Sequence, residues 1–279
     1  MSNAPLQTVH QQVESQEMPS VAELLNVAAK QSVLRVQNYA NMSARCVANF
    51  FTRPRYVQDT LQQMDDIGVG SLPIVLLSGF FIGAVMVLQT GSSFARFGEA
   101  SMTGDVVSLA LVRELGPTIT GLLVAGRCAS GIASELGSML VTEQVDAMRA
   151  MGTDPSRKLI SPRVLAAVIV VPLLTSFSVL VGLVGGMVAS ALSLRLDPVM
   201  FWQRATATLE FSDLMQAVTK SMVFAFILST VGCYQGLNVR GGTQGVGRAT
   251  TQAVVVSSVM IIVADTFLTR IALFLAGKL

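Results

Sequence analysis

Long stretches of apolar residues, separated by short polar segments, dominate the chain. One of them, from Val164 to Leu194, contains no ionisable residue at all. An α-helix needs about 20 apolar residues to cross the hydrocarbon core of a bilayer, and this stretch exceeds that length. A buried helix of a soluble protein is the alternative, but such helices rarely stay apolar for so long. The pattern therefore predicts a membrane-spanning helix.

The same pattern recurs along the chain and predicts an all-α membrane protein with five spans. The predicted spans cover residues 69–90, 106–136, 163–194, 214–237 and 251–276. Because proline lacks a backbone N–H, we expect Pro172 to kink the third span or to start a second half of it. Glycines that allow close helix packing occur in the first span at Gly79 and Gly83, and in the third at Gly182 and Gly185. Phe201 and Trp202 follow the third span in a predicted polar loop and suit the membrane–water interface.

The N-terminal region differs from the spans. Residues 1–20 are rich in Gln, Ser and Glu and lack the pattern of a signal peptide, so we expect a disordered tail. From Val21 to Arg55, apolar residues recur three or four positions apart with basic residues between them. This pattern fits an ordinary surface helix or a helix lying in the membrane interface, and the apolar remainder of the chain favours the second. We therefore expect a membrane domain over 21–279 that opens with an interfacial helix region, 21–60.

The composition of the chain agrees with a membrane location. Its 279 residues are 52% hydrophobic and 13% charged, whereas soluble domains have about 25% charged residues. A net charge of +2, with no basic run interleaved with aromatic residues, argues against a nucleic-acid partner. One histidine, three scattered cysteines and the lack of a Walker A motif predict no metal, no cofactor and no enzymatic activity in this chain.

Basic residues are distributed unequally over the polar segments. Most lie in the N-terminal flank and in the polar segments after the second and fourth predicted spans. Since Lys and Arg are enriched in cytoplasmic loops, the N-terminus is predicted in the cytoplasm and the C-terminus on the outer side.

Charged residues within the predicted spans are candidates for function, because a charge at the bilayer centre costs about 2.5–3.5 kcal/mol on insertion scales. The strongest candidates are Arg113, Glu114, Lys220 and Asp265. We hypothesise that Arg113 and Lys220 lie toward the outer leaflet and meet a phosphate headgroup, while Glu114 holds one of them in place. An internal ion pair that only positions helices is an equal alternative. The apolar path for acyl chains is expected to include Phe81, Val85 and Leu88.

The polar segment between the second and third spans contains a short amphipathic helix. Its apolar residues at helical spacing are Val141, Val145, Met148 and Met151. Gly152 can adopt the left-handed conformation that ends a helix, and Pro155 prevents its continuation. A cytoplasmic partner could grip such a rigid helix and tilt both flanking spans, although a plain solvated connector explains the pattern equally well.

The run from Glu114 to Arg163 resembles the signature of the MlaE/YrbE/TGD1 permease family. The family's elements ELGP, AGR, ELG-M-VTEQ-DA-MG-DP and PR occur here in order. Gly247–Ser257 also resembles the family's entry into its last span. The resemblance covers approximately Arg55 to Leu279 and leaves residues 1–20 outside.

This resemblance implies the permease subunit of an ABC transporter in the bacterial inner membrane. The implied cargo is phospholipid, moved between the inner membrane and an MCE-protein conduit so that outer-membrane lipid asymmetry is maintained. The implied partners are a second copy of the chain, two copies of an ABC ATPase that uses ATP and Mg²⁺, and a hexameric MCE-domain protein on the periplasmic side. The ATPase would dock on the short cytoplasmic helix as a coupling helix, through Thr142, Glu143, Gln144, Asp146, Met148, Arg149 and Gly152.

Two other functional classes fit a chain with five spans. A secondary transporter or channel would be expected to contain an internal repeat with paired broken helices, and neither is evident in the sequence. A non-transporting membrane scaffold differs from a transporter because an ATPase purified with it would not respond to lipid.

Overall fold

The computed structural model of the protein describes residues 21–50 and 56–275, and these form helices without any strand. The predicted tail, 1–20, lies outside the described residues. The chain divides into two compact units, 1–44 and 45–279. The predicted class, an all-α membrane protein, is confirmed.

The first helix, α2 (Val21–Phe50), contains most of the predicted interfacial region. It is not among the described helices that are long and apolar enough to cross a membrane. Val33, Leu34 and Val36 are exposed on it, as expected for an amphipathic helix, while its placement in the membrane interface stays a prediction. Near its end, burial raises the pKa of the Cys46 thiol to about 11, so this thiol is neutral at physiological pH.

Five helical stretches in the second unit are long and apolar enough to span a membrane. Three are α3 (Val57–Arg96), α10 (Phe211–Leu237) and α11 (Gly242–Leu275). The second span is built from η1 (Ala100–Met102), α4 (Thr103–Ala110), η2 (Leu111–Leu115), α5 (Gly116–Val124), η3 (Ala125–Ala129) and α6 (Ser130–Val141). The third span is built from η4 (Ser156–Ile160), α8 (Ser161–Ala189) and η5 (Ser190–Leu194). Except at the ends of the third, fourth and fifth spans, the helices extend beyond the predicted apolar stretches because polar residues continue them.

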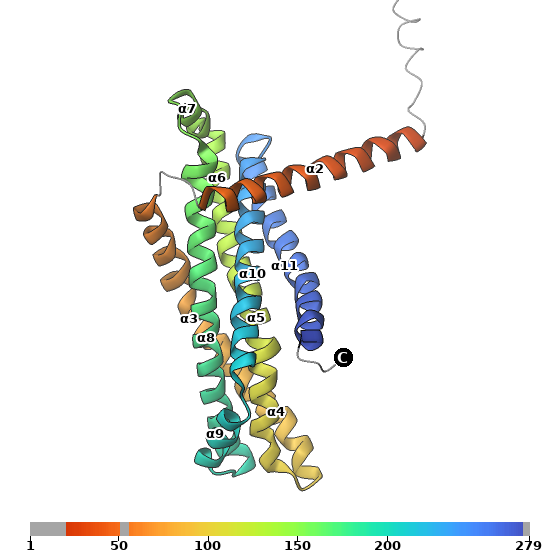
Figure 1. Ribbon diagram of the computed structural model, residues 1–279, viewed down its shortest axis with the longest axis vertical. Helices are drawn as coiled ribbons and strands as arrows, with labels where there is room; N and C mark the ends of the chain where they lie inside the picture. The colour runs from red at the N-terminus through yellow and green to blue at the C-terminus, as the bar shows by residue number, and fades with distance from the viewer. Residues whose placement is uncertain (1–20, 51–55, 276–279) are drawn as a thin grey trace, which may run out of the picture. The chain divides into compact units, whose positions relative to one another are not determined.

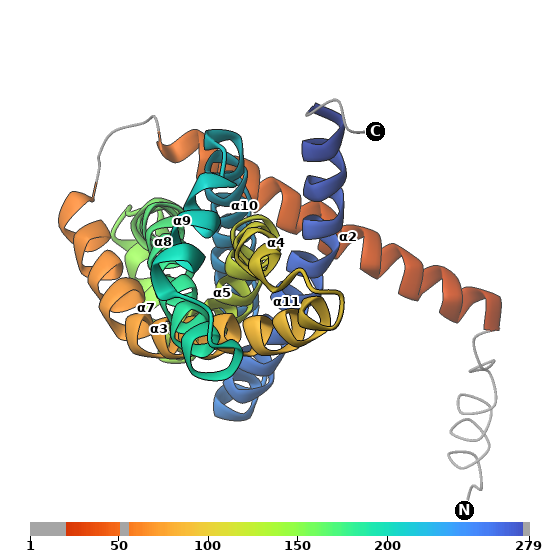
Figure 2. The same ribbon diagram turned by 90° about the horizontal axis from the view of Figure 1, so that it is seen from below.

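The spans form a bundle with α5, α8 and α10 at its centre. Figures 1 and 2 show α3 and α11 on opposite flanks of this bundle. Helix α3 packs along α8, which packs on α10, and α11 packs on α10 and α6. Two short helices, α7 (Gln144–Ala150) and α9 (Pro198–Ala207), lie at opposite ends of the bundle (Figure 1).

Glycines bring α3 and α8 into backbone contact, as predicted. A Cβ atom at Gly83 would overlap the backbone carbonyl of Gly182, and one at Gly185 would overlap that of Phe80. A Cβ at Gly79 would lie 2.6 Å from the Ser178 carbonyl oxygen. Small residues at such positions let membrane helices approach closely enough to gain dispersion contacts.

The structure differs from expectation in the third span and in the segment after it. Helix α8 runs through Pro172 without interruption, so the proline does not begin a second half, and the alternative of a kink stays a prediction; proline is tolerated in membrane helices where neighbouring groups satisfy the freed backbone. The predicted loop after it contains α9, which Asp197 caps by accepting from the Val199 N–H at 3.1 Å. Phe201 on α9 is only 3% exposed rather than interfacial.

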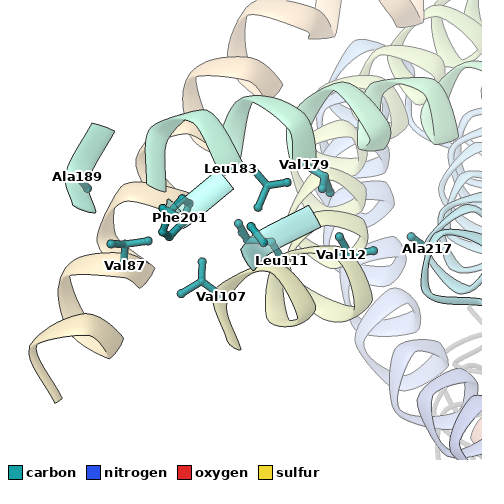
Figure 3. Packing of buried hydrophobic residues seen from close by; sticks show 10 residues of the cluster. Val87, Val107, Leu111, Val112, Val179, Leu183, Ala189, Phe201 and Ala217 are labelled. Carbon is teal, nitrogen blue, oxygen red and sulfur yellow. The ribbon is translucent and has the colours of Figure 1, made fainter. Parts of the chain in front are cut away.

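Figure 3 shows Phe201 within a cluster of buried apolar side chains from α3, α4, η2, α8, α9 and α10. Its neighbours in the cluster include Val87 of α3, Val107 of α4 and Leu183 of α8. The short helix α9 therefore folds back and closes one end of the bundle, because burial of a large aromatic side chain stabilises this position more than an interfacial one would.

Replacing Gly83 with alanine tests the backbone contact between α3 and α8. The added methyl group has no room against the Gly182 carbonyl, so we expect a loss of about 1–3 kcal/mol in stability, as in overpacked cores. The measurement is the midpoint of thermal unfolding in detergent. The control is Gly131→Ala, since a Cβ at Gly131 meets nothing within 4 Å; equal midpoints for the two variants would contradict the packing described here.

Candidate functional site

The second span carries two adjacent charged residues, Arg113 and Glu114, in the π-helical turn η2. Such turns are rare inside helices and often mark functional sites. Pro117 follows and has no N–H to donate to the Arg113 carbonyl four residues earlier. That carbonyl instead accepts from Lys220 Nζ at 3.0 Å. The ELGP sequence thus opens the helix and lets a side chain from α10 bind to its backbone.

Lys220 is the centre of a buried polar cluster. Its ammonium donates to Glu114 Oε2 at 2.6 Å and to Thr269 Oγ1 at 2.8 Å, and it lies 2.9 Å from Asp265 Oδ1. Thr118 Oγ1 donates to the other Asp265 oxygen at 3.1 Å. The Lys220 side chain is 1% exposed. A buried ammonium is stable only when it is paired and hydrogen-bonded, and these contacts, the Lys220 cluster, join η2, α10 and α11.

Arg113 points to a different partner on α10. Its Nε donates to Asp213 Oδ1 at 2.6 Å, and the Asp213 side chain is 4% exposed while that of Arg113 is 28% exposed. The second Asp213 oxygen accepts from the Glu210 N–H at 3.1 Å in a capping box at the start of α10. The capping box therefore also fixes the position of Arg113.

One face of α11 explains how this helix is held. Its buried residues recur every four positions from Gly245 through Ala249, Ala253, Ser257 and Ile261. The same stripe continues with Asp265 and Thr269, which belong to the Lys220 cluster. Apolar packing thus holds the first part of α11, and polar contacts hold its last part.

A cavity of about 610 Å³ opens beside the Lys220 cluster, between η2, the first half of α10 and the end of α11. Its charged or polar lining consists of Arg113, Glu114, Glu210, Ser212, Asp213, Gln216, Thr219, Lys220 and Thr269. Its apolar lining consists of Met215, Leu268, Ile271, Ala272 and Leu273. A membrane cavity with one charged and one apolar wall can hold the headgroup of an amphiphile beside its hydrocarbon.

The structure brings the four charged candidates, Arg113, Glu114, Lys220 and Asp265, together from three spans. Glu114 holds Lys220 in place, as hypothesised. The Lys220 ammonium, however, is surrounded by protein acceptors, which fits the alternative of an internal ion pair better than direct headgroup contact. The headgroup hypothesis remains open for Arg113, which is partly exposed in the cavity.

Residues outside the predicted set complete the site. Asp213, Thr269 and Thr118 supply contacts that only the fold reveals. The sequence does indicate Thr269, because it follows Asp265 by one helical turn and so lies on the same face of the helix. The predicted acyl-path residues Phe81, Val85 and Leu88 are exposed on α3 and do not line this cavity.

The short helix between the second and third spans is α7, which lies beyond α6 and α8 at one end of the bundle (Figure 1). Glu143 precedes it in a left-handed conformation with φ of 60°, and Gly152 follows with φ of 78°. Val145 is buried, but Met151 is 74% exposed and Val141 is also exposed, so the predicted apolar face is only partly covered. Of the predicted coupling residues, Met148 is half-buried and Thr142, Glu143, Gln144, Asp146, Arg149 and Gly152 are exposed.

An ion pair connects the two helices that flank α7. Arg163, at the start of α8, is 6% exposed in its side chain and donates to Glu135 of α6 at 2.5 Å. Arg163 also donates to the Leu159 carbonyl at 2.7 Å. A displacement of α7 would therefore be transmitted to both spans together.

A helical membrane bundle with an amphipathic cavity and an exposed helix at one end is compatible with a transport subunit. The family model described as Permease MlaE matches residues 60–271, and the chain belongs to this permease family. Together with the five apolar helices, this indicates a multi-pass protein of the inner membrane.

Three relatives illustrate the range of the family. A probable ABC transporter permease protein of Rickettsia typhi is 37% identical over 89% of this chain and 97% of its own length. The intermembrane phospholipid transport system permease protein MlaE of Haemophilus influenzae is 36% identical over 78% of this chain and 83% of its own. The chloroplastic protein TRIGALACTOSYLDIACYLGLYCEROL 1 of Arabidopsis thaliana is 39% identical over 75% of this chain and 59% of its own.

Replacing Lys220 with methionine tests the role of the buried ammonium. The change leaves Glu114 and Asp265 without their common cation, and breaking such a buried pair typically costs about 3–5 kcal/mol. We expect a clear fall in the thermal unfolding midpoint and partial recovery when Asp265→Asn is added. The control is Lys158→Met, which removes a partly exposed pair with Asp59 worth at most about 1 kcal/mol. An unchanged midpoint for Lys220→Met would show that the cluster does not hold α11.

Proposed function

We propose that this chain is the membrane-spanning permease subunit of an ABC transporter that moves phospholipids between the inner membrane and an MCE-protein conduit. The observation that carries the proposal is the cavity with one charged and one apolar wall between α10 and α11. The relatives include a probable ABC transporter permease protein, which supports the transporter class, and a permease protein of an intermembrane phospholipid transport system. Transport of this kind maintains the lipid asymmetry of the outer membrane.

The proposal assigns a side of the membrane to each end of the bundle. The excess of basic residues in the N-terminal flank and around α7 favours a cytoplasmic position for both. Helix α9 lies at the end of the bundle opposite α7 (Figure 1) and is therefore on the periplasmic side. The cavity lies in the same half, because η2 and the first half of α10, which line it, directly follow α4 and α9 in the chain. The C-terminus is periplasmic, and so is the partner MCE-domain protein.

The proposed energy source is a separate ABC ATPase, in two copies, that binds ATP and Mg²⁺ and docks on α7. The exposed Met151 and the exposed pair Asp146–Arg149, 2.8 Å apart, offer it apolar and charged contacts. A second copy of this chain completes the transporter, and the chain itself binds no cofactor.

The coupling follows from the contacts at the two ends of the bundle. A push on α7 moves α6 and α8 together because Glu135 and Arg163 join them. The second span carries this movement to η2, where Glu114 contacts Lys220 of α10. The last part of α11 is joined to the same cluster, so the cavity walls shift when the second span moves.

The proposal is tested by purifying the permease with its ATPase. We expect ATPase activity that rises with added phospholipid, as a transporter requires. A co-purifying ATPase whose activity does not change with added lipid would favour a membrane scaffold. Lipid transport driven by an ion gradient without ATP would favour a secondary transporter.

Charge reversal on α7 tests the docking surface. We expect Glu143→Lys combined with Asp146→Lys to reduce ATPase co-purification about tenfold, because the partner's basic residues would then meet like charges. The measurement is the ratio of ATPase to permease after affinity purification. The matched control is Glu99→Lys at the opposite end of the bundle; an equal loss in the control, or no loss in the double variant, would exclude the docking role.

Neutralising Arg113 tests the cavity. Arg113→Gln removes the partly exposed cation at the cavity wall, and we expect phospholipid transport in proteoliposomes to fall about tenfold, the effect of losing roughly 1.4 kcal/mol of binding. The control is Arg204→Gln, whose partner Asp105 lies 3.5 Å away and outside the cavity lining. Normal transport by Arg113→Gln would remove this residue from the mechanism.

A further inference from the structure

The charges around the cavity between α10 and α11 do not balance. The cations in its lining are Arg113 and Lys220, and the carboxylates in its lining are Glu114, Glu210 and Asp213. Asp265, bound to Lys220, adds a further carboxylate directly beside the cavity. Among the described residues, carboxylates therefore outnumber cations around this space.

The ion pairs around the cavity show which carboxylates carry the excess negative charge. Arg113 is matched by the buried carboxylate of Asp213. Lys220 is shared between Glu114 and Asp265, so one of these two negative charges is not compensated. Glu210 is exposed, and its donors among the described residues are the neutral Ser212 hydroxyl and Asp213 N–H at the start of α10. The excess negative charge is thus shared between Glu114 and Asp265 beside Lys220, with a second negative charge at Glu210.

Exposure decides which of these groups a ligand can reach. The Glu114 side chain is 39% exposed and Glu210 is exposed, whereas Lys220 is enclosed. Arg113, 28% exposed, is the accessible cation of the lining. A ligand in the cavity therefore meets one accessible cation and two accessible carboxylates.

We propose that the cavity prefers phospholipids whose headgroup carries a primary amine, as in phosphatidylethanolamine, over phospholipids with a purely anionic headgroup. This inference depends on the proposed function and names the substrate class of the same site. The phosphate pairs with Arg113, and the ammonium donates hydrogen bonds to Glu114 and Glu210. An anionic headgroup without an amine brings a further negative charge to carboxylates that have no spare cation, and like charges placed together oppose binding.

A primary amine also fits the site better than a choline group. An ammonium donates up to three hydrogen bonds, whereas a quaternary amine donates none. Quaternary ammonium groups are typically held by aromatic cages, and none of the described residues that line this cavity is aromatic. Carboxylate acceptors are present instead.

The test is competition for the purified permease in detergent. A fluorescent phospholipid is displaced by phosphatidylethanolamine, phosphatidylcholine or phosphatidylglycerol with identical acyl chains. We expect phosphatidylethanolamine to compete best and phosphatidylglycerol about tenfold less well. Glu210→Gln keeps an oxygen acceptor for the α10 cap but removes the charge, so it should reduce this ratio severalfold. Glu114→Gln should do the same.

The control is Glu99→Gln, a carboxylate at the same end of the bundle but outside the cavity lining, which should leave the ratio unchanged. Equal competition by phosphatidylethanolamine and phosphatidylglycerol would overturn the inference. So would a ratio between the two lipids that neither Glu210→Gln nor Glu114→Gln alters. In both cases the cavity would still bind lipid, so the proposed function would not be affected. Equal competition by phosphatidylcholine would overturn the primary-amine preference. If no phospholipid displaces the probe and Arg113→Gln does not affect its binding, the proposed function of the cavity itself fails.

Discussion

The need to compensate one buried ammonium determines how the last two spans are arranged. Lys220 lies inside a helix that is otherwise apolar enough to cross a membrane, and a charge there is tolerated only with partners. Its partners come from η2 and from α11, so satisfying this single group fixes three helices relative to one another. The cavity lies beside the last part of α11, which is held through these polar contacts.

The two sides of the bundle are therefore held by different forces. Helices α3 and α8 touch through their backbones at Gly79, Gly83 and Gly185, where a larger residue has no room. Close packing of this kind is bistable rather than freely deformable. Helices α10 and α11 meet beside the cavity through the hydrogen bond and ion pair that the enclosed Lys220 makes with Thr269 and Asp265.

Sequence reasoning succeeded where local pattern suffices. Stretches of apolar residues identified all five spans, and the glycines of α3 and α8 were assigned to close helix packing, although the sequence did not indicate that these two helices meet each other. It failed where contacts between residues distant in the chain determine the position of a side chain. Phe201 was assigned to the membrane interface by residue type, but α9 folds it into the core. The four charged residues were found because charges are rare in spans, yet their partners Asp213 and Thr118 carry no signal in one sequence. Lys220 is enclosed by η2, α10 and α11 together, and this enclosure is what keeps it from direct contact with a headgroup. No single one of these segments indicates it.

The bond from Lys220 to the Arg113 carbonyl links two positions that the chain separates widely. Proline at 117 cannot complete the backbone ladder of its own helix, and a side chain from another helix substitutes for the missing donor. Lys220 therefore serves the backbone of the second span as well as its carboxylate partners. A residue with an N–H at position 117 would compete with Lys220 for the Arg113 carbonyl oxygen.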